Sequence, residues 1–196
     1  MPFLIGGGWF LLALFIGETG LLTLLPGPAP QAILGALTLV LLVSYWKIQA
    51  FGRWVDSLPV RALLAPHLCR FVGFYFLFLS VRGELPRQFA IPAGWGDIAV
   101  ATGAVALLLV RTPRGALLAW NWLGLADILF VVIKAASLRW ADPGSLDAFA
   151  QLPLSFLPTM LVPLIISTHV VLFARLRRSA SARPGEKLGS ELLSAQ

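Results

Sequence analysis

The chain has 196 residues, of which 58% are hydrophobic and 12% are charged. Soluble domains average roughly 45–50% apolar and about 25% charged residues, so an ordinary soluble domain and a disordered chain are excluded. The 15 basic residues outnumber the 9 acidic ones and give a formal net charge of +6. In so apolar a chain, basic residues orient membrane helices more often than they bind nucleic acid. The composition therefore predicts a small multi-pass membrane protein whose partner is the lipid bilayer, with no nucleic acid.

Six stretches are long and apolar enough to cross a bilayer, which takes about 20 apolar residues per helix. The first has no basic residue before it and exceeds the apolar core of a secretory signal, so we expect a retained helix. The fourth is the shortest, because Pro92, Gly94 and Gly96 interrupt its start. Together they predict an all-α bundle of about six transmembrane helices. The expected spans are 3–25, 32–51, 62–81, 94–110, 115–137 and 153–176.

Basic residues gather in alternate connections, which predicts N-in, C-in orientation in an inner (plasma) membrane. We expect residues 1–178 to form the transmembrane domain and 179–196, rich in Ser, Ala and charge, to form a flexible cytoplasmic tail. The expected inner residues are Lys47, Arg53, Arg61, Arg111, Arg114, Arg175, Arg177, Arg178, Arg183 and Lys187, and the outer ones are Arg82, Arg87, Lys134 and Arg139. The tryptophans expected at inner ends are Trp46, Trp54, Trp120 and Trp122.

Several polar side chains fall inside these spans, where an ionisable group usually faces the bundle interior and has a partner. At 1.5 Å per residue, His67, Asn121 and His169 each lie roughly 9 Å from the inner boundary. Arg70 follows His67 by one turn on the same face. These four residues form an expected inner polar layer. The candidate residues for handling substrate or protons are Arg70, Asp127, Asn121, His169, Glu18 and Asp97.

Span five carries a polar stripe, because Asn121, Gly124 and Asp127 recur every three residues. Such a stripe is either a helix-pairing seam or a lining for water and substrate. Asp127 and Glu18 are expected about midway along their spans and form a second, middle layer. The offset between Arg70 and Asp127 is roughly 7 Å, which is within reach of an arginine side chain. We therefore predict that these two side chains approach each other.

The segment 83–97 is too apolar for an ordinary loop and too interrupted by proline and glycine for a spanning helix. We expect a packed loop, or a re-entrant lid over an outward-facing site, since non-helical backbone at membrane depth must be buried or line a cavity. Asp97 is expected to cap the helix that follows. In span six, Pro153, Pro158 and Pro163 predict a kinked helix that is either a pathway wall or a packing kink.

A motif in the segment 83–97 consists of Leu85-Pro86, Phe89-Ala90, Pro92-Ala93-Gly94 and Gly96-Asp97, and Asn121, Gly124 and Asp127 follow it in span five. On these residues the chain resembles, from span three to span six, a family of uncharacterised multi-pass bacterial inner-membrane proteins. Arg70, Gly73, Gly83, Leu152-Pro153, Pro158-Thr159, Pro163 and His169 match as well. The family has no known activity, so the resemblance implies important positions without implying a reaction.

Three functions remain open. The first is transport or binding of a small solute or ion, with protons carried by acidic residues and with a homo-oligomer enclosing the pathway. The second is a redox protein with b-type haem held by His67 and His169. The third is a structural or assembly protein, in which the polar residues only fix helix packing. A membrane enzyme has less support, because no nucleophile or metal-binding spacing is present.

Overall fold

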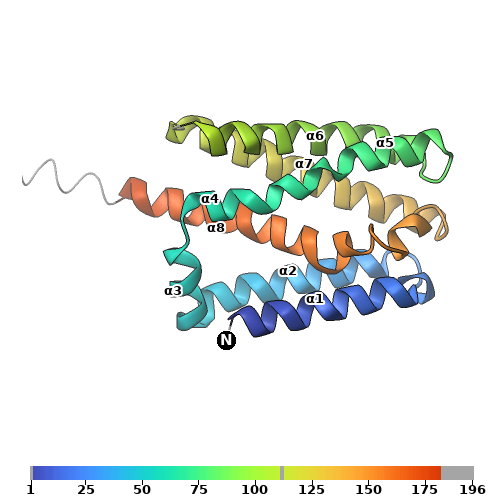
Figure 1. The fold of residues 1–196 in the computed structure, drawn as a ribbon, viewed down its shortest axis with the longest axis horizontal. Coiled ribbons are helices and arrows are strands. Elements are labelled where there is room, and N and C mark those ends of the chain that lie inside the picture. The colour runs from blue at the N-terminus through green and yellow to red at the C-terminus, as the bar shows by residue number, and fades with distance from the viewer. Residues whose placement is uncertain (1, 111–112, 182–196) are drawn as a thin grey trace, which may run out of the picture.

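The computed structural model describes residues 2–110 and 113–181, and every regular element within them is helical, as expected (Figure 1). These helices indicate an all-α membrane protein. A short apolar helix, Ile5–Thr19, precedes the longer ones. The helices long and apolar enough to cross a membrane are Ala29–Lys47, Val60–Val81, Arg87–Leu109, Arg114–Ala141 and Leu157–Ser179.

The long helices run side by side along the long axis of the molecule (Figure 1). The start of the first helix and the end of the last lie at the same end of the bundle. The α-helices are α1 (Pro2–Thr19), α2 (Ala29–Lys47), α3 (Gln49–Ser57), α4 (Val60–Leu64), α5 (Gly73–Val81), α6 (Arg87–Leu109), α7 (Arg114–Ala141) and α8 (Val162–Ser181). The 3₁₀ segments are η1 (Leu21–Leu24), η2 (Ala65–Val72) and η3 (Asp147–Ala150), and a π-helical turn, η4 (Leu157–Leu161), leads into α8.

Most expected spans coincide with helices, but several boundaries differ. Helix α1 ends at Thr19, because Gly20 takes a left-handed conformation with φ of 63°, a common way to end a helix. The second span breaks at Ile48, and α3 follows as a separate helix. The expected tail boundary after residue 178 falls inside α8, and residues 182–196, with Arg183 and Lys187, lie outside the described residues, as does Arg111.

In the segment 83–97 only residues 83–86 form a turn, and from Arg87 onward the segment is helical, so the expected loop or re-entrant lid over the rest of it was wrong. Pro86 precedes the first residue of α6, and the helix continues from Arg87 through Pro92. The glycines here allow close packing: a Cβ on Gly94 would lie 2.9 Å from the carbonyl oxygen of Gly73. A Cβ on Gly96 would collide with the carboxylate of Asp127. These residues bring α6 against α5 and α7 and do not interrupt it.

Replacing Gly73 with leucine is expected to lower the free energy of unfolding by about 1–3 kcal/mol or more, as overpacking does. Its side chain would meet the backbone of Gly94 directly and separate α5 from α6. The matched control is Gly35→Leu in α2, where a Cβ meets nothing within 4 Å. Thermal unfolding of both detergent-purified variants measures the difference, and equal melting temperatures would contradict the predicted contact.

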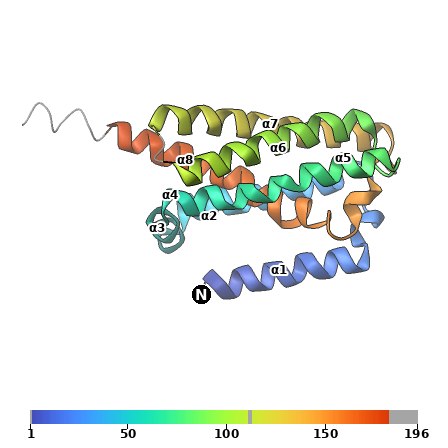
Figure 2. The ribbon, with the colours of Figure 1, turned by 45° about the horizontal axis from the view of Figure 1, so that its top comes forward.

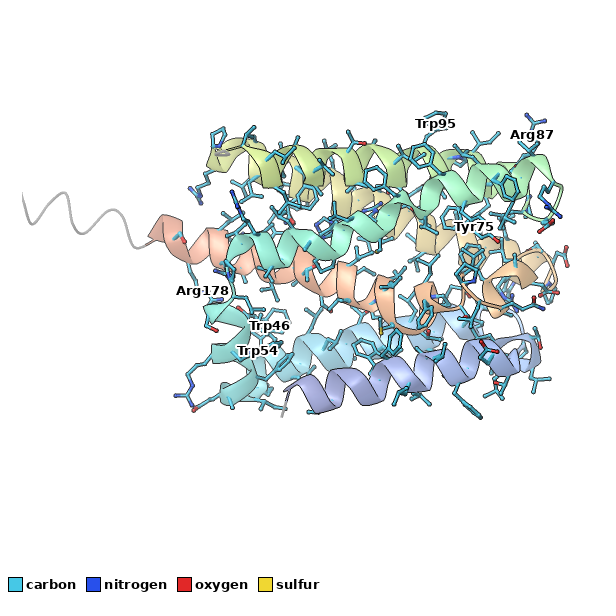
Figure 3. All side chains as sticks on the ribbon, viewed as in Figure 1. Trp46, Trp54, Tyr75, Arg87, Trp95 and Arg178 are labelled. Atoms are coloured by element: carbon cyan, nitrogen blue, oxygen red, sulfur yellow. The ribbon has the colours of Figure 1, made fainter. Side chains whose placement is uncertain are left out.

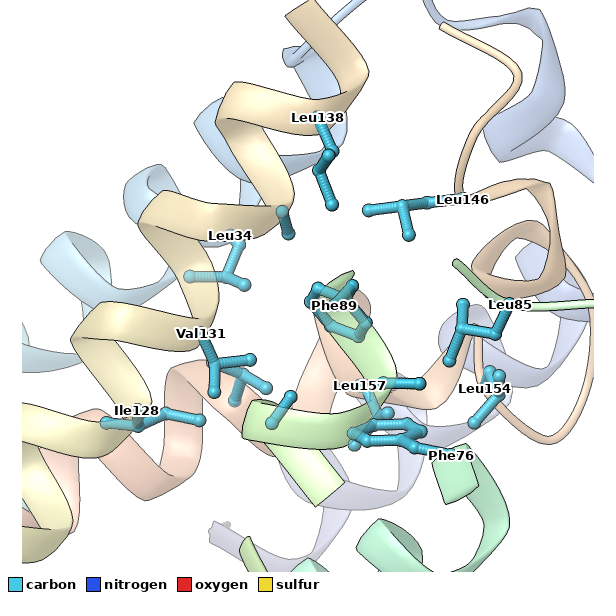
Figure 4. Close-up of a cluster of buried hydrophobic side chains, with 14 of the residues drawn as sticks. Leu34, Phe76, Leu85, Phe89, Ile128, Val131, Leu138, Leu146, Leu154 and Leu157 are labelled. Carbon is cyan, nitrogen blue, oxygen red and sulfur yellow. The ribbon is translucent and has the colours of Figure 1, made fainter. Parts of the chain in front are cut away.

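The main apolar core lies between α5, α6, α7 and the segment before α8 (Figure 4). Its central members are Phe76 and Phe89, which are 2% and 1% exposed. The outer faces of the helices are also apolar, and Leu39, Leu123 and Ile133 are each more than 60% exposed. An exposed apolar surface of this extent marks an interaction site in a soluble protein, and in this bundle it is the surface that lipid would cover.

Helix α1 lies at the edge of the bundle, and a proline explains one of its attachments (Figure 2). Pro163 has no N–H to donate to the carbonyl of Thr159, four residues earlier. The indole Nε1 of Trp9 donates to that carbonyl at 2.9 Å. Phe10 also stacks on Phe156, with ring centroids 5.4 Å apart. The carbonyl that this proline leaves without its usual helical donor therefore helps to attach α1 to the segment before α8.

An ion pair fixes α3 to the end of α8, at the end of the bundle that also carries Trp46 and Trp54 (Figure 3). The guanidinium of Arg178 donates to both carboxylate oxygens of Asp56 at 2.9 and 3.0 Å. The hydroxyl of Tyr45 donates to the same carboxylate at 2.9 Å. Burial acts to raise the pKa of Asp56, but the bonds from Arg178 and Tyr45 outweigh it and hold that pKa below its ordinary value.

Candidate functional site

The third span presents one buried face with a period of three residues. Leu64, His67, Arg70, Gly73 and Phe76 are all buried. Part of this span is the 3₁₀ segment η2, in which side chains three residues apart eclipse one another. This geometry places His67 and Arg70 on the same line and directs both into the bundle. Arg70 is 1% exposed, which is rare for a charged side chain unless it is paired.

Arg70 binds two carboxylates from two other helices. Its Nε donates to Oδ1 of Asp97 on α6 at 2.6 Å. Its Nη2 donates to Oδ2 of Asp127 on α7, so the predicted approach of Arg70 to Asp127 is confirmed. Its Nη1 donates to the carbonyl of Gly124 at 3.0 Å. One guanidinium thereby ties the third span to both α6 and α7.

The charges in this cluster do not balance. Arg70 contributes one positive charge, and Asp97 and Asp127 contribute two negative ones when ionised, which leaves one uncompensated negative charge. The side chain of Asp97 is 5% exposed and that of Asp127 is 20% exposed. An unpaired charge inside a membrane is expensive, so the arrangement favours uptake of one cation or proton, with Asp127 as the more accessible acid.

The space beside the cluster is small. A cavity of about 30 Å³ lies next to Arg70 and Asp97, which is about the share of liquid volume that one water occupies. This cavity therefore has room for about one water and not for a larger solute.

The two histidines lie next to each other, beside this cluster. His169 Nδ1 is 2.7 Å from Oδ1 of Asn121, and Nδ2 of Asn121 donates to the His169 carbonyl at 3.1 Å. The amide oxygen must then accept, so His169 carries its proton on Nδ1. His67 Nε2 is 3.1 Å from the hydroxyl of Thr168. The other ring nitrogens, Nδ1 of His67 and Nε2 of His169, are buried and have no hydrogen-bond partner in the described part of the chain.

Gly124 joins the arginine cluster to the histidines. Its carbonyl accepts from Arg70, and a Cβ at this position would lie 2.6 Å from Cε1 of His169. The absence of a side chain therefore lets the imidazole pack directly on α7. Because Arg70 also binds Asp127, the expected inner layer and Asp127 of the expected middle layer form one network.

Not every predicted residue belongs to the network. Glu18 is exposed in the last turn of α1 and makes no contact with the network in the residues the structure describes. Asp97 belongs to the network, but it lies inside α6 and does not cap it, because the helix begins ten residues earlier, at Arg87. Its carboxylate binds Arg70 and not the first N–H groups of a helix.

Trp120 and Thr168 are network residues that were not among the predicted ones. Trp120 was expected at the membrane interface, but it is 8% exposed, and its ring lies 4.9 Å from that of His67 and 5.3 Å from that of His169. Its Nε1 donates to the Val100 carbonyl at 3.0 Å. The signal that could have found Trp120 is its helical spacing, because it stands four residues before Gly124 and seven before Asp127 and so shares their face of the helix.

The histidine geometry does not fit the expected haem site. Two axial imidazoles stand on opposite sides of a porphyrin and are separated by it. Here the rings of His67 and His169 are in contact, with centroids 4.3 Å apart, and Trp120 packs against both. Among the described residues, no group of three or more His, Cys, Asp or Glu side chains is placed to hold a metal ion.

A family model described as "Domain of unknown function (DUF8737)" matches residues 28–177. The matched range includes every residue of the polar network and leaves out all of α1. It agrees with the resemblance to an uncharacterised family. No curated protein and no solved structure matches the chain.

Proposed function

The chain belongs to this DUF8737 family of unknown function, and we propose that it binds a proton at Arg70, Asp97 and Asp127 and couples it to transport of a small solute. The observation that carries this proposal is the single buried guanidinium shared by two carboxylates. Protonation of one carboxylate makes the cluster neutral, and loss of that proton leaves it with one net negative charge. Such a change in charge within a membrane is a means of driving a conformational change.

We also propose an orientation in the membrane, an oligomeric state and the part that the cluster plays in transport. The excess of basic residues at the end of the bundle where α1 begins and α8 ends supports N-in, C-in orientation in an inner membrane. The 20% exposure of the Asp127 side chain supports a homo-oligomer, in which a second copy would shield this acid from lipid. The small cavity at Arg70 supports a role for the cluster in binding protons, with the solute passing elsewhere.

Proton movement into liposomes that contain the purified protein and a trapped pH-sensitive dye tests this function. We expect the wild-type protein to acidify the interior under an imposed pH gradient. Asp127→Asn should slow this by roughly 100-fold, the lower end of what a positioned acid–base group contributes. The matched control is Glu84→Gln, which also removes one carboxylate from an ion pair but at an exposed site. An Asp127→Asn protein with the wild-type rate would contradict the proposal.

A further inference from the structure

The two ends of the bundle differ in charge. At the end where α1 begins and α8 ends (Figure 1), the described residues include seven basic side chains and one acidic one, that of Asp56. At the opposite end they include four basic and four acidic side chains. We call the first of these the basic end, and its basic residues are Lys47, Arg53, Arg61, Arg114, Arg175, Arg177 and Arg178. The opposite end carries Arg82, Arg87, Lys134 and Arg139 together with Glu18, Glu84, Asp142 and Asp147.

The protein itself compensates little of the positive charge at the basic end. The carboxylate of Asp56 is already bound by Arg178. Arg114 donates to a backbone carbonyl of α8 at 2.8 Å, and Arg175 donates to the carbonyl between α3 and α4 at 2.8 Å. A carbonyl has no net charge, so both guanidinium groups remain uncompensated by these bonds. Within the described ranges, no ion pair with a carboxylate is formed by Lys47, Arg53 or Arg61.

A cavity of about 500 Å³ lies in the basic end, between α2, α3 and α8, and we call it the end cavity. Its wall includes Trp46, Arg177 and Arg178. It is open to the surroundings, because Trp46 is 57% exposed and the side chain of Arg178 is also 57% exposed. Arg178 is held in place by Asp56, which accepts one N–H of Nη1 at 2.9 Å. The second N–H of Nη1 is left for a ligand, so the end cavity presents positive charge and a positioned donor.

The basic residues adjoin an apolar surface, and this combination defines the ligand. Val43 and Ile48, on either side of Trp46 in the chain, are 46% and 54% exposed. Trp46 lies at the same end as Arg178 (Figure 3), and tryptophan favours the level of lipid headgroups. A guanidinium pairs well with phosphate oxygens. We propose that the basic end binds an anionic phospholipid such as phosphatidylglycerol, with its phosphate in the end cavity and its acyl chains against the exposed apolar side chains of α2.

Net charge and apolar contact distinguish this ligand from related ones. Phosphatidylcholine carries the same phosphate, but its choline cation would lie among basic side chains and be repelled by them. A free phosphate would use the charge but leave the apolar side chains beside Trp46 without a partner. The inference does not depend on proton binding at Arg70, because no residue of the polar network lines the end cavity.

Photolabelling of the full chain in nanodiscs tests the inference. The probes are phosphatidylglycerol and phosphatidylcholine with the same diazirine-bearing acyl chain, each as a minor component of dioleoylphosphatidylcholine. We expect phosphatidylglycerol to label the segments that contain Trp46 and Arg178 roughly fivefold more than phosphatidylcholine, the factor that one basic side chain near an anionic lipid contributes. The segment that contains Arg87, at the opposite end (Figure 3), should show no preference.

Two further conditions separate the sources of binding. Salt at about 1 M, which screens charges beyond about 3 Å, should remove most of the excess labelling by phosphatidylglycerol. Equal labelling by the two probes at low salt would overturn the inference. Complete displacement of the phosphatidylglycerol probe by inorganic phosphate would assign the end cavity to a free anion and would also overturn it.

A pair of double variants locates the preference on the protein. Lys47→Gln/Arg53→Gln removes two exposed positive charges from α2 and α3, the helices beside the end cavity. We expect the preference for phosphatidylglycerol to fall by roughly half or more. The matched control, Arg87→Gln/Lys134→Gln, removes the same charge from the opposite end and should keep the wild-type preference. An unchanged preference in the first variant, or an equal loss in both, would contradict binding at the basic end.

Discussion

Replacing Arg70 with glutamine is expected to lower the free energy of unfolding by about 3–5 kcal/mol, as breaking a buried ion pair does. The wild-type guanidinium donates to Asp97, to Asp127 and to the Gly124 carbonyl. Glutamine is shorter and uncharged, so it leaves two carboxylates close together without a counter-ion. Thermal unfolding in detergent, followed by circular dichroism, measures the loss.

The control for this variant is Arg82→Gln, which removes an arginine from an ion pair at the surface. The side chains of Arg82 and Glu84 are 59% and 46% exposed, and exposed pairs contribute about 0–1 kcal/mol. The two variants therefore delete the same chemical group in opposite environments. Equal stability of Arg70→Gln and Arg82→Gln would show that the buried pairs do not hold the third span to α6 and α7.

The positions of the spans could be predicted from the sequence because hydrophobic length is a local property. A run of about 20 apolar residues has only one stable arrangement across a bilayer. Segment 83–97 was misjudged because its glycines and prolines were read only as interruptions. A glycine inside a helix also permits close contact, as Gly73 and Gly94 do. Which of the two roles applies depends on a neighbouring helix that the local sequence does not specify.

The network was predicted in part, since the rarity of charge within a span points to residues that need partners. This reasoning identified Arg70, Asp127, Asn121 and His169. It placed Glu18 in the interior because depth along a helix was estimated but the direction of the side chain was not. It assigned Trp120 to the membrane–water interface because indole rings are common there. An indole ring can also be buried where its N–H has a hydrogen-bond acceptor, and the sequence does not distinguish the two cases.

Asparagine substitutions at Asp97 and Asp127 separate the folding role of the cluster from its proposed proton-binding role. Asparagine resembles a protonated aspartate in shape, and it cannot release a proton. In Asp127→Asn, Arg70 keeps one carboxylate, that of Asp97, and the cluster is neutral without a proton. We therefore expect Asp127→Asn to be at least as stable as the wild-type protein, within about 1 kcal/mol.

The double variant Asp97→Asn/Asp127→Asn is expected to be far less stable than either single one. It leaves the charge of Arg70, which is 1% exposed, without any carboxylate. An uncompensated buried charge of this kind lowers stability by about 3–5 kcal/mol. Chemical unfolding of the wild-type protein, both single variants and the double variant measures this order. If the double variant matched the single ones, the charge of Arg70 would need no partner, and the charge balance that supports proton binding would be wrong.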